Sequence, residues 1–528
     1  MLENLEPQKV FQYFEEICSI PHGSGNVDAI SDYLVDFAKK QGLWWKQDAL
    51  KNVIIIKEAS RGKENRPAVM IQGHMDMVAV KEAYADIDME KEGLKLGIDG
   101  DYVYAKDTSL GADDGIALAY GMALLSDESI SHPRLELVVT TEEEVGMEGA
   151  TGIDLSPCMG MKMLNIDSEE EGQFVAACAG GIRVNGKIPV ERDVDWHGGD
   201  KSSKIRIMLT GFTGGHSGTE IGKSSGNANI VLGWFLKELS KEVDITIYEM
   251  QGGSKDNAIP VESYAVVGNG GTVEGKLWAD KVISCCNRLQ EEMQKRFAAT
   301  DPACRIVLET VEDEEEDNKK ENDKKENNKE ENDRKENDKE EDNGEENSKK
   351  ENLPCGCLKM EEGRKILDFL AKAPNGVQSM CEEPEGLVQT SLNLGIMKLE
   401  EDGLQVAFSL RSSVAREKEE LKKRVCALIE AYKGLVTTAG DYPAWEYKKD
   451  SPLREKMLEV YEKQYGEKPL VLSLHAGLEC GILAAKKPGL DCVSFGPDIL
   501  DIHTTRERMS ISSVNRVWKF LVEVIEEL

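Results

Sequence analysis

Hydrophobic residues follow two alternating patterns over the first 185 positions. Apolar side chains at helical spacing, such as Val10, Phe11, Phe14 and Ile17, are typical of an amphipathic helix. Helices of this kind are expected over residues 7–18, 27–41 and 116–125. Short apolar runs between turn residues predict buried strands at 53–57, 68–72, 135–139 and 161–166. Strands that alternate with helices indicate an α/β fold with a mostly parallel sheet covered by helices on both faces.

The pattern changes in the middle of the chain. Strands with alternating polar and apolar residues are predicted in IRIMLTGF, ITIYEMQGG, SYAVVGN and QVAFSLRS. Amphipathic helices are expected over 226–240, 276–297, 362–373 and 416–432. After residue 441 the helix–strand alternation returns, with a helix at 454–465 and a strand at 491–495. We therefore predict one α/β domain in two pieces, residues 1–185 and 441–528, and an inserted α+β domain, residues 186–440.

Residues 311–352 repeat a Lys-Glu-Asn theme with almost no apolar side chain. Such a segment cannot bury a core, so we expect a disordered or weakly helical surface loop. A role as a partner-binding arm is the alternative.

Elsewhere, Cys355 and Cys357 form an isolated CxC without a second pair, which disfavours a structural zinc site.

Charge and hydropathy exclude several classes of partner. The formal net charge of −33 disfavours binding to nucleic acid or to an anionic membrane. No apolar run approaches the roughly 18 residues of a membrane span, and the N-terminus is a charged amphipathic helix rather than a signal peptide. We expect a cytoplasmic protein.

Residue types that bind metals follow the predicted strands of the α/β domain. Because the carboxyl ends of parallel strands meet at one edge of a sheet, these side chains are expected to lie together. His74, Asp76, Glu143, Glu144 and Asp167 follow the strands of the first part, and His503 follows the strand at 491–495. Asp113 instead opens the helix that comes after Gly111.

Each of these signals is weak alone. A single His-x-Asp is more often part of a polar loop, the helix dipole could explain Asp113 and Asp114, and runs of Glu usually face solvent. Together they suit two divalent ions. Nitrogen and oxygen donors without thiolate favour Zn²⁺, with Co²⁺ or Mn²⁺ possible. One carboxylate must bridge the ions, and the adjacent glutamates Glu143 and Glu144 allow one to bind metal while the other acts as a base.

The order of the motifs carries a more specific signal. The chain contains, in order, GHMDMV, LGADDGIALA, TTEEEVGMEGA, LNIDSEEEG, GGHSG, NAIP, HAGLECG and a final His-x-x-x-Glu. With these motifs it resembles the di-zinc metallopeptidase family that includes the aminoacylases and the glutamate-releasing carboxypeptidases. Within that family it is similar to the bacterial aminoacyl-histidine dipeptidases. The resemblance spans nearly the whole chain except residues 311–352.

The resemblance implies a role for each motif residue. His74 and Asp167 would bind one metal, and Glu144 and His503 the other. Asp113 would bridge the two, through a cis bond to Asp114. Glu143 would be the general base, and Asp76 would orient His74. The inserted domain would act as a lid, and the implied substrate-binding residues are His216, Asn257, Arg411 and, less specifically, His475. The family commonly ends its last motif in HSPDE, whereas this chain has HTTRE, so Arg506 replaces an acid.

Alternatives remain open from the sequence. His216 could be only a turn residue, Arg411 a surface ion-pair partner, and His475 a wall residue without a function. His22, His132 and His197 are expected to be surface loop residues. The expected activity is hydrolysis of unblocked dipeptides, including Xaa-His substrates, by a monomer or a homodimer. The alternatives are hydrolysis of N-acyl amino acids, or a catalytically silent scaffold that uses the charged insert to bind partners.

Overall fold

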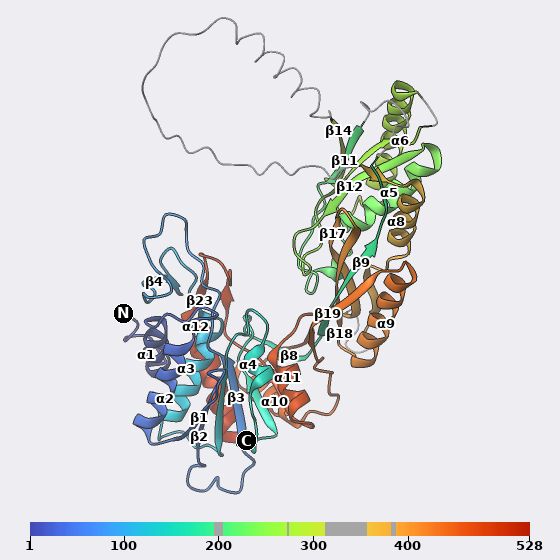
Figure 1. Ribbon diagram of the computed structural model, residues 1–528. Helices are drawn as coiled ribbons and strands as arrows, with labels where there is room; N and C mark the ends of the chain where they lie inside the picture. The colour runs from blue at the N-terminus through green and yellow to red at the C-terminus, as the bar shows by residue number, and fades with distance from the viewer. Residues whose placement is uncertain (195–203, 272–273, 312–355, 382–386) are drawn as a thin grey trace, which may run out of the picture.

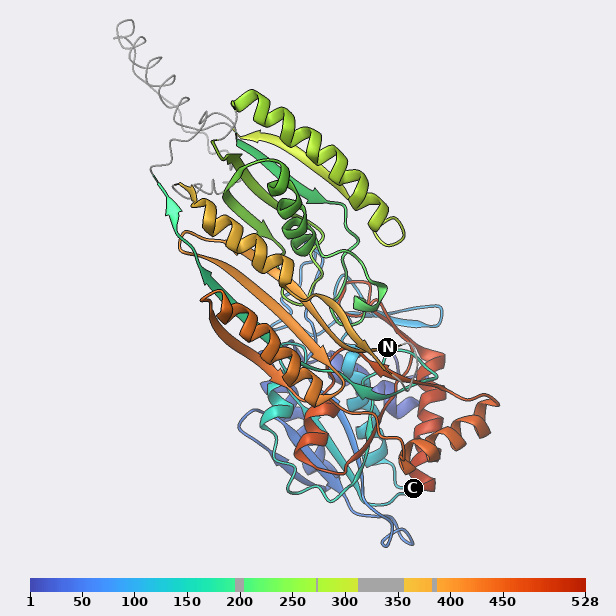
Figure 2. The same cartoon turned by 90° about the vertical axis from the view of Figure 1, so that its right-hand side faces the viewer.

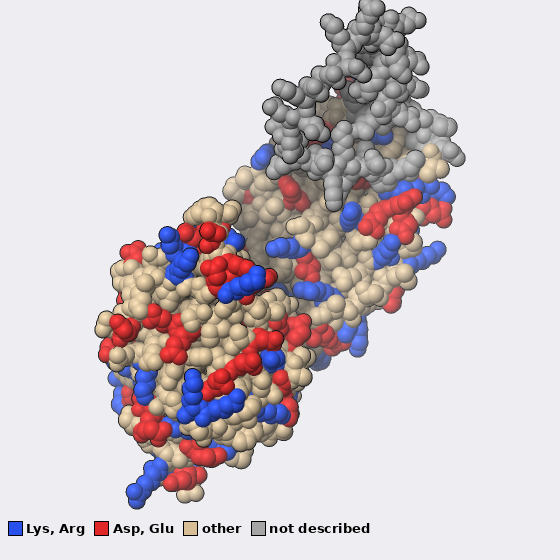
Figure 3. Space-filling view, turned by 60° about the vertical axis from the view of Figure 1, so that its left-hand side comes forward, with Lys and Arg blue, Asp and Glu red and all other residues tan. Residues whose placement is uncertain are grey.

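The protein consists of two bodies that the chain connects twice (Figure 1). The computed structural model describes residues 1–194, 204–271, 274–311, 356–381 and 387–528. The predictions made for the insert at 311–352, apart from Val311, and for His197 and Cys355 therefore lie outside the described residues. In the space-filling view, Lys and Arg side chains are mixed with Asp and Glu over both bodies (Figure 3).

The lower body in Figure 1 is built on a mixed sheet. Within the described residues, this sheet has eight strands in the order β1-β2-β6-β3-β7-β21-β8-β20. Their bounds are β1 (Trp44–Gln47), β2 (Val53–Lys57), β3 (Val69–His74), β6 (Leu135–Thr140), β7 (Lys162–Asn165), β8 (Gln173–Cys178), β20 (Leu470–Leu474) and β21 (Asp491–Ser494). The central strands β6, β3, β7 and β21 are parallel to one another. At one edge β2 and β1 continue the sheet in antiparallel fashion, and at the other β8 is antiparallel to β21 and parallel to β20.

Helices cover both faces of this sheet. Val69 and Ile71 of β3 belong to one hydrophobic core and Met70 to another, because successive side chains of a strand point to opposite faces. The helices of the first core are α1 (Gln8–Cys18), α2 (Asp28–Gln41), α3 (Ala112–Ser126), α10 (Pro452–Tyr465) and α12 (Ile511–Glu527). Those of the second are α4 (Glu148–Gly152) and α11 (Glu479–Lys486). The α/β fold with helices on both faces is confirmed.

The upper body, which we call the inserted domain, is an antiparallel sheet with helices on one face (Figures 1 and 2). In its described part the sheet has nine strands, in the order β14-β11-β13-β12-β17-β18-β9-β19, with β16 also paired to β17. The strands are β9 (Gly180–Pro189), β11 (Lys204–Thr210), β12 (Ile245–Gly252), β13 (Ser263–Asn269), β14 (Arg305–Val311), β16 (Gly376–Met380), β17 (Val388–Leu399), β18 (Gly403–Ser412) and β19 (Leu435–Tyr442). The helices are α5 (Ala228–Glu242), α6 (Gly275–Arg296), α8 (Met360–Lys372) and α9 (Ala415–Ala431).

The chain enters and leaves the inserted domain on neighbouring strands. β9 begins two residues after β8 ends, and β19 pairs with β9 in antiparallel register, with Tyr442 opposite Gly181. The predicted domain limits at 186 and 440 fall inside these two strands. The division of the chain into domains stays a prediction.

Short elements complete the described fold. The sequence at 93–101 reads as polar, yet it contains β4 (Leu96–Asp99), which pairs with β5 (Tyr102–Ala105) in a small sheet with β23 (Arg508–Ser510) and β22 (Ile499–Leu500). Four-residue strands hold too few periods for the alternation to be visible in the sequence. The remaining elements are β10 (Arg192–Asp193), β15 (Cys357–Leu358) and the 3₁₀ helix η1 (Ile221–Lys223). None of the helices in the described ranges is long and apolar enough to cross a membrane.

Candidate metal centre

Three neighbouring parallel strands bring the predicted ligands to one edge of the sheet. His74 is the last residue of β3 and lies opposite Thr140, the last residue of β6. On its other side, Gln72 lies opposite Asn165, where β7 ends. The segments that carry Glu143 and Asp167 therefore leave the sheet beside His74, as expected for the carboxyl ends of parallel strands.

Asp113 lies between two imidazoles. Its Oδ1 is 3.1 Å from His74 Nε2, and its Oδ2 is 3.2 Å from His503 Nε2. On the first side, Asp167 Oδ1 lies 3.6 Å from His74 Nε2. On the second side, Glu144 Oε1 lies 2.9 Å from His503 Nε2. The five predicted ligands thus form two sets that share one carboxylate.

The chain is irregular where Asp113 enters the site. Asp113 and Asp114 have non-helical dihedral angles at the start of α3, and the peptide bond between them is cis. This places the Asp114 carboxylate, which accepts a hydrogen bond from the backbone N–H of His74 at 3.2 Å, under the end of β3. The cis bond implied by the resemblance is present.

The electrostatics of this cluster require positive charge. Burial lowers the pKa of His74, but Asp113, Asp167 and Asp76 outweigh it and raise that pKa well above the usual value. Contacts with Asp113 and Glu144 raise the pKa of His503 to about 10. Burial raises the pKa of Asp167 to about 6. Cations among the buried carboxylates, whether imidazolium or metal, would relieve the cost of holding so many negative charges together.

The donor set fits a divalent metal. Two groups in the described residues have donor atoms within 4.8 Å of one another, namely His74 with Asp114 and Asp167, and His74 with Asp113 and Glu144. Glu144 Oε1 is buried, and its polar contact in the described residues is with His503 Nε2 at 2.9 Å. Imidazole nitrogen and carboxylate oxygen without thiolate suit Zn²⁺, Mn²⁺ or Co²⁺. Asp114 is a possible donor that the sequence suggested only as a helix-capping residue.

Asp76 and Glu143 lie beside the donors. The ring Nδ1 of His74 donates to the backbone carbonyl of Asp76 at 3.0 Å, while the Asp76 carboxylate is 3.6 Å away. This contact leaves Nε2 free to bind a metal. The Asp76 carboxylate instead accepts hydrogen bonds from Glu143 N, at 3.1 Å, and from Ser24 Oγ, at 2.8 Å. Asp76 therefore connects the end of β3 to the Glu143 loop.

The predicted substrate residues lie around the start of the inserted domain. Arg411 on β18 is 8% exposed, and its Nη1 donates to the Tyr442 hydroxyl at 3.0 Å. His475 Nε2 is 2.8 Å from Ser391 Oγ on β17, a contact between the two bodies. Burial lowers the pKa of His475 to about 4 and also lowers the pKa of His216. In both cases the positive charge of Arg411 is the second cause.

Asn257 joins this group through its backbone. Its carbonyl accepts a hydrogen bond from Ser217 N at 2.8 Å, and His216 forms a β-bridge with Ala258, so the NAIP and GGHSG loops lie side by side. Within the described residues, no hydrogen bond or ion pair joins His216, Asn257, Arg411 or His475 to the metal-ligand candidates. Tyr442 had no signal in the sequence, because only the pairing of β9 with β19 brings it beside Arg411.

Two expectations for histidines are wrong. His22 and His132 are each 2% exposed rather than surface residues, and their Nδ1 atoms bond to the backbone carbonyls of Ile20 and Pro133. A neighbouring proline suggested an exposed loop in both cases, but the loops fold back onto the domain.

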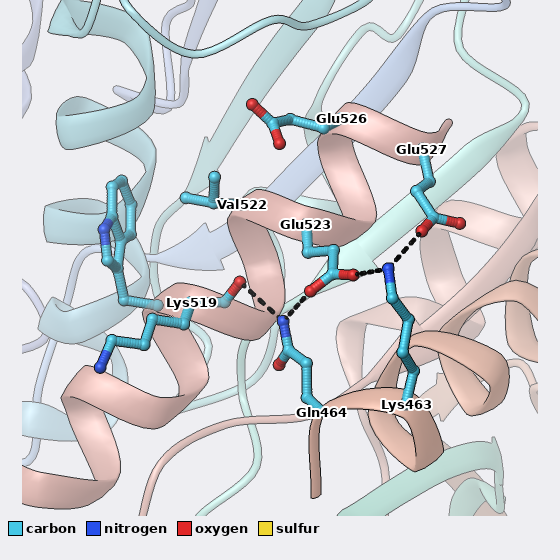
Figure 4. Close-up of a pocket in the computed structure, with 8 residues that line it drawn as sticks. Lys463, Gln464, Lys519, Val522, Glu523, Glu526 and Glu527 are labelled. Atoms are coloured by element: carbon cyan, nitrogen blue, oxygen red, sulfur yellow. Dashed lines mark hydrogen bonds and ion pairs between the residues drawn. The ribbon is translucent and has the colours of Figure 1, made fainter.

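A surface hollow between α10 and α12 lies outside this site (Figure 4). Lys463 Nζ is 2.5 Å from Glu523 and 3.5 Å from Glu527, and Gln464 also bonds to Glu523. Lys463, Gln464, Glu523 and Glu527 therefore bond to one another, and the described residues that line the hollow form no cluster of imidazole and carboxylate donors like that of the metal-ligand candidates.

A helix-covered sheet with imidazole and carboxylate donors at its strand ends is the arrangement of a metal-binding α/β protein. The chain belongs to peptidase family M20/M25/M40, whose model matches residues 70–527. The predicted family is confirmed.

The chain is similar to named members over its full length. It is 31% identical over 530 residues to the cytosol non-specific dipeptidase of Escherichia coli (strain K12), covering 100% of this chain and 99% of that protein. It has 31% identity and a TM-score of 0.83 to the crystal structure of aminoacylhistidine dipeptidase from Vibrio alginolyticus, covering 100% and 98% of the two chains. Aminopeptidase PepT from Bacillus cereus ATCC 10987 has 14% identity, a TM-score of 0.53 and 99% coverage of both chains, and shows the fold alone.

Proposed function

We propose that this protein is a di-zinc dipeptidase that hydrolyses unblocked dipeptides, Xaa-His dipeptides among them. The observation that carries the proposal is the position of Asp113, whose two carboxylate oxygens face different histidines at 3.1 and 3.2 Å. A carboxylate shared in this way is what two neighbouring divalent ions require.

Each residue has a distinct role in the proposed site. His74, Asp167 and Asp113 would hold one ion, and Glu144, His503 and Asp113 would hold the other. Asp114 hydrogen-bonds to the backbone at His74 and supports the end of β3. When bound, the ions supply Lewis acidity and lower the pKa of water at the site.

Glu143 is the proposed general base. Its side chain makes no hydrogen bond or ion pair with the other described residues, and burial is the first cause that raises its pKa well above the usual range. Glu143 takes a proton from the attacking water as the new C–O bond forms. It then gives that proton to the nitrogen of the leaving amino acid as the C–N bond breaks. One water is consumed, and two amino acids are released.

The choice of dipeptides rests on the two 31% identical relatives, whose names describe dipeptidases. Arg411, with His216 and His475 nearby, suits the carboxylate at the end of a short substrate. The N-acyl amino acids share that carboxylate, so they are the second candidate substrate class. Location in the cytosol and assembly as a monomer or a homodimer belong to the same proposal.

A substrate panel tests the proposal. The purified protein is assayed with dipeptides, including Xaa-His, and with the matching N-acetyl amino acids, before and after chelation and with metal analysis. We expect dipeptide turnover that chelator abolishes and Zn²⁺ restores, with two ions per chain. Turnover of N-acetyl substrates alone would favour the deacylase. Bound metal without turnover of either class would favour a silent scaffold.

A further inference from the structure

Glu507 ends the final His-x-x-x-Glu motif of the sequence but is in neither group of metal donors. Its side chain is buried, with the residue 3% exposed. Its Oε2 accepts hydrogen bonds from Leu110 N at 2.8 Å and Gly111 N at 3.2 Å, and its Oε1 accepts one from Ala112 N at 2.8 Å. Three consecutive backbone N–H groups therefore bind one carboxylate.

This arrangement joins the two loops that carry Asp113 and His503. Ala112 directly precedes Asp113, and Glu507 follows His503 by four residues. The turn before Asp113 has little freedom, because Gly111 has a φ of +67° and an added Cβ would lie 2.7 Å from Met77 Sδ. His503 itself has a φ of +60°, which is uncommon for a residue with a side chain. Both ligands thus stand on irregular backbone that needs outside support.

No ion pair with Lys, Arg or His compensates Glu507 in the described structure. A buried carboxylate is costly unless hydrogen bonds satisfy it, and here only backbone N–H groups do so. Simple capping of α3 would not require the carboxylate to come from the His503 loop.

We propose that Glu507 is a positioning residue that holds the His503 loop against the Asp113 turn and so fixes the second metal position. The proposal rests on the proposed function, because it assumes that Asp113 and His503 bind a common ion. In the structure these two side chains are 3.2 Å apart. Glu507 acts on that distance through the two backbone segments and touches neither side chain.

The substitution Glu507→Gln tests this role. The amide keeps one acceptor oxygen but turns its NH₂ group toward a backbone N–H, so the two loops separate. We expect the ion that Asp113 and His503 would share to lose affinity by about 10- to 100-fold, as for other residues that orient metal ligands. The measurement is Zn²⁺ competition against a chromogenic chelator, with folding checked by circular dichroism. We expect kcat at subsaturating Zn²⁺ to fall more than KM changes, and excess Zn²⁺ to restore part of it.

Asp101→Asn is the matched control. Asp101 also supports a helix start in the α/β domain, since it accepts hydrogen bonds from Ser512 N at 3.0 Å and from the hydroxyls of Ser510 and Ser512. We expect this variant to lose stability but to keep both metal affinities. Glu507→Asp, which keeps the charge on a shorter side chain, should bind the second ion with an affinity between those of Glu507→Gln and the wild type.

Several outcomes decide the matter. The proposal is overturned if folded Glu507→Gln binds both metals with wild-type affinity, which would leave Glu507 as a cap of α3. If Glu507→Gln does not fold, wild-type affinities in folded Glu507→Asp have the same meaning. Equal loss of affinity in Asp101→Asn would also overturn it. A wild type that binds two ions without cleaving dipeptides would refute the proposed function alone, since the affinities still test Glu507. A wild type that binds no divalent metal would refute both.

Discussion

Glu143 and Glu144 are adjacent, yet they lie in different surroundings. Glu144 Oε1 is 2.9 Å from His503, whereas the Glu143 side chain has no polar partner in the described residues. Asp76 holds the backbone of Glu143 at 3.1 Å. At the scale of single residues, this difference in surroundings supports Glu144 as the proposed metal ligand and Glu143 as the proposed base.

Glu143→Gln should therefore remove catalysis and keep the metal. The amide cannot take a proton from water, so we expect kcat to fall by about 10² to 10⁴. Metal content, measured by elemental analysis, should stay at the wild-type value. The exposed Glu148→Gln serves as the control and should retain full activity. Normal turnover of Glu143→Gln would refute the proposed mechanism.

The lowered pKa of His475 predicts that the stability of the protein depends on pH. Burial, followed by the charge of Arg411, lowers its pKa to about 4. Between this value and the ordinary 6.5 the unfolded chain binds the extra proton, so stability decreases as pH falls through that range. The contribution lost is about 3 kcal/mol.

The comparison of His475→Gln with the wild type isolates this effect. His22, His132 and His216 also have lowered pKa values and remain in both proteins. Urea unfolding at pH 7.5 and pH 5 should show a smaller loss of stability in the variant. Equal losses in both proteins would contradict the assignment to His475.

At the scale of elements, β9 and β19 connect the two bodies. Lys418 on α9, 5% exposed, donates to the Tyr442 carbonyl and to Asp441, both at 2.6 Å. The Tyr442 hydroxyl accepts a hydrogen bond from Arg411. The end of β19 thus positions an arginine proposed to bind substrate.

Gly181→Ala should disturb this connection. An added Cβ would lie 2.4 Å from the Tyr442 hydroxyl oxygen. We expect stability to fall by about 1–3 kcal/mol through overpacking and KM for dipeptides to rise as Arg411 shifts. Thermal unfolding and steady-state kinetics measure the two effects.

Gly363→Ala, in α8, is the matched substitution. Its nearest contact would be 3.8 Å, an ordinary separation. An alanine inside a helix should stabilise by up to about 1 kcal/mol and leave KM unchanged. A rise of KM in this variant too would show that the inserted domain responds to any such change.

At the scale of the whole molecule, the Lys-Glu-Asn segment is set apart by its composition. It lies between β14 and β15 of the inserted domain, far in sequence from every metal-ligand candidate. We replace residues 313–352 by a shorter Gly/Ser linker. Because the free energy of closing a loop depends only weakly on its length, the inserted domain should keep its fold and the kcat/KM for dipeptides should stay unchanged. Loss of activity, or a changed mass in solution by light scattering, would instead support a partner-binding arm.

Local pattern predicted much of this protein. Buried strands and amphipathic helices each place apolar residues at a regular spacing in the sequence. This spacing is clear in the apolar runs around β3, β6 and β7 and in the helical periodicity of α1 and α2. The residue types at the strand ends indicated metal chemistry, and their order along the chain indicated the family, later confirmed by the match over residues 70–527.

Other features depended on contacts between distant segments. Burial of His22 and His132, the β4–β5 hairpin and the position of Tyr442 beside Arg411 arise from tertiary packing that short-range periodicity does not encode. The sequence by itself determined which side chains could bind metal and on which elements they stand. Only the tertiary structure decided that Asp113 faces two histidines and that Glu507 holds the turn before it, because residues almost 400 positions apart meet there.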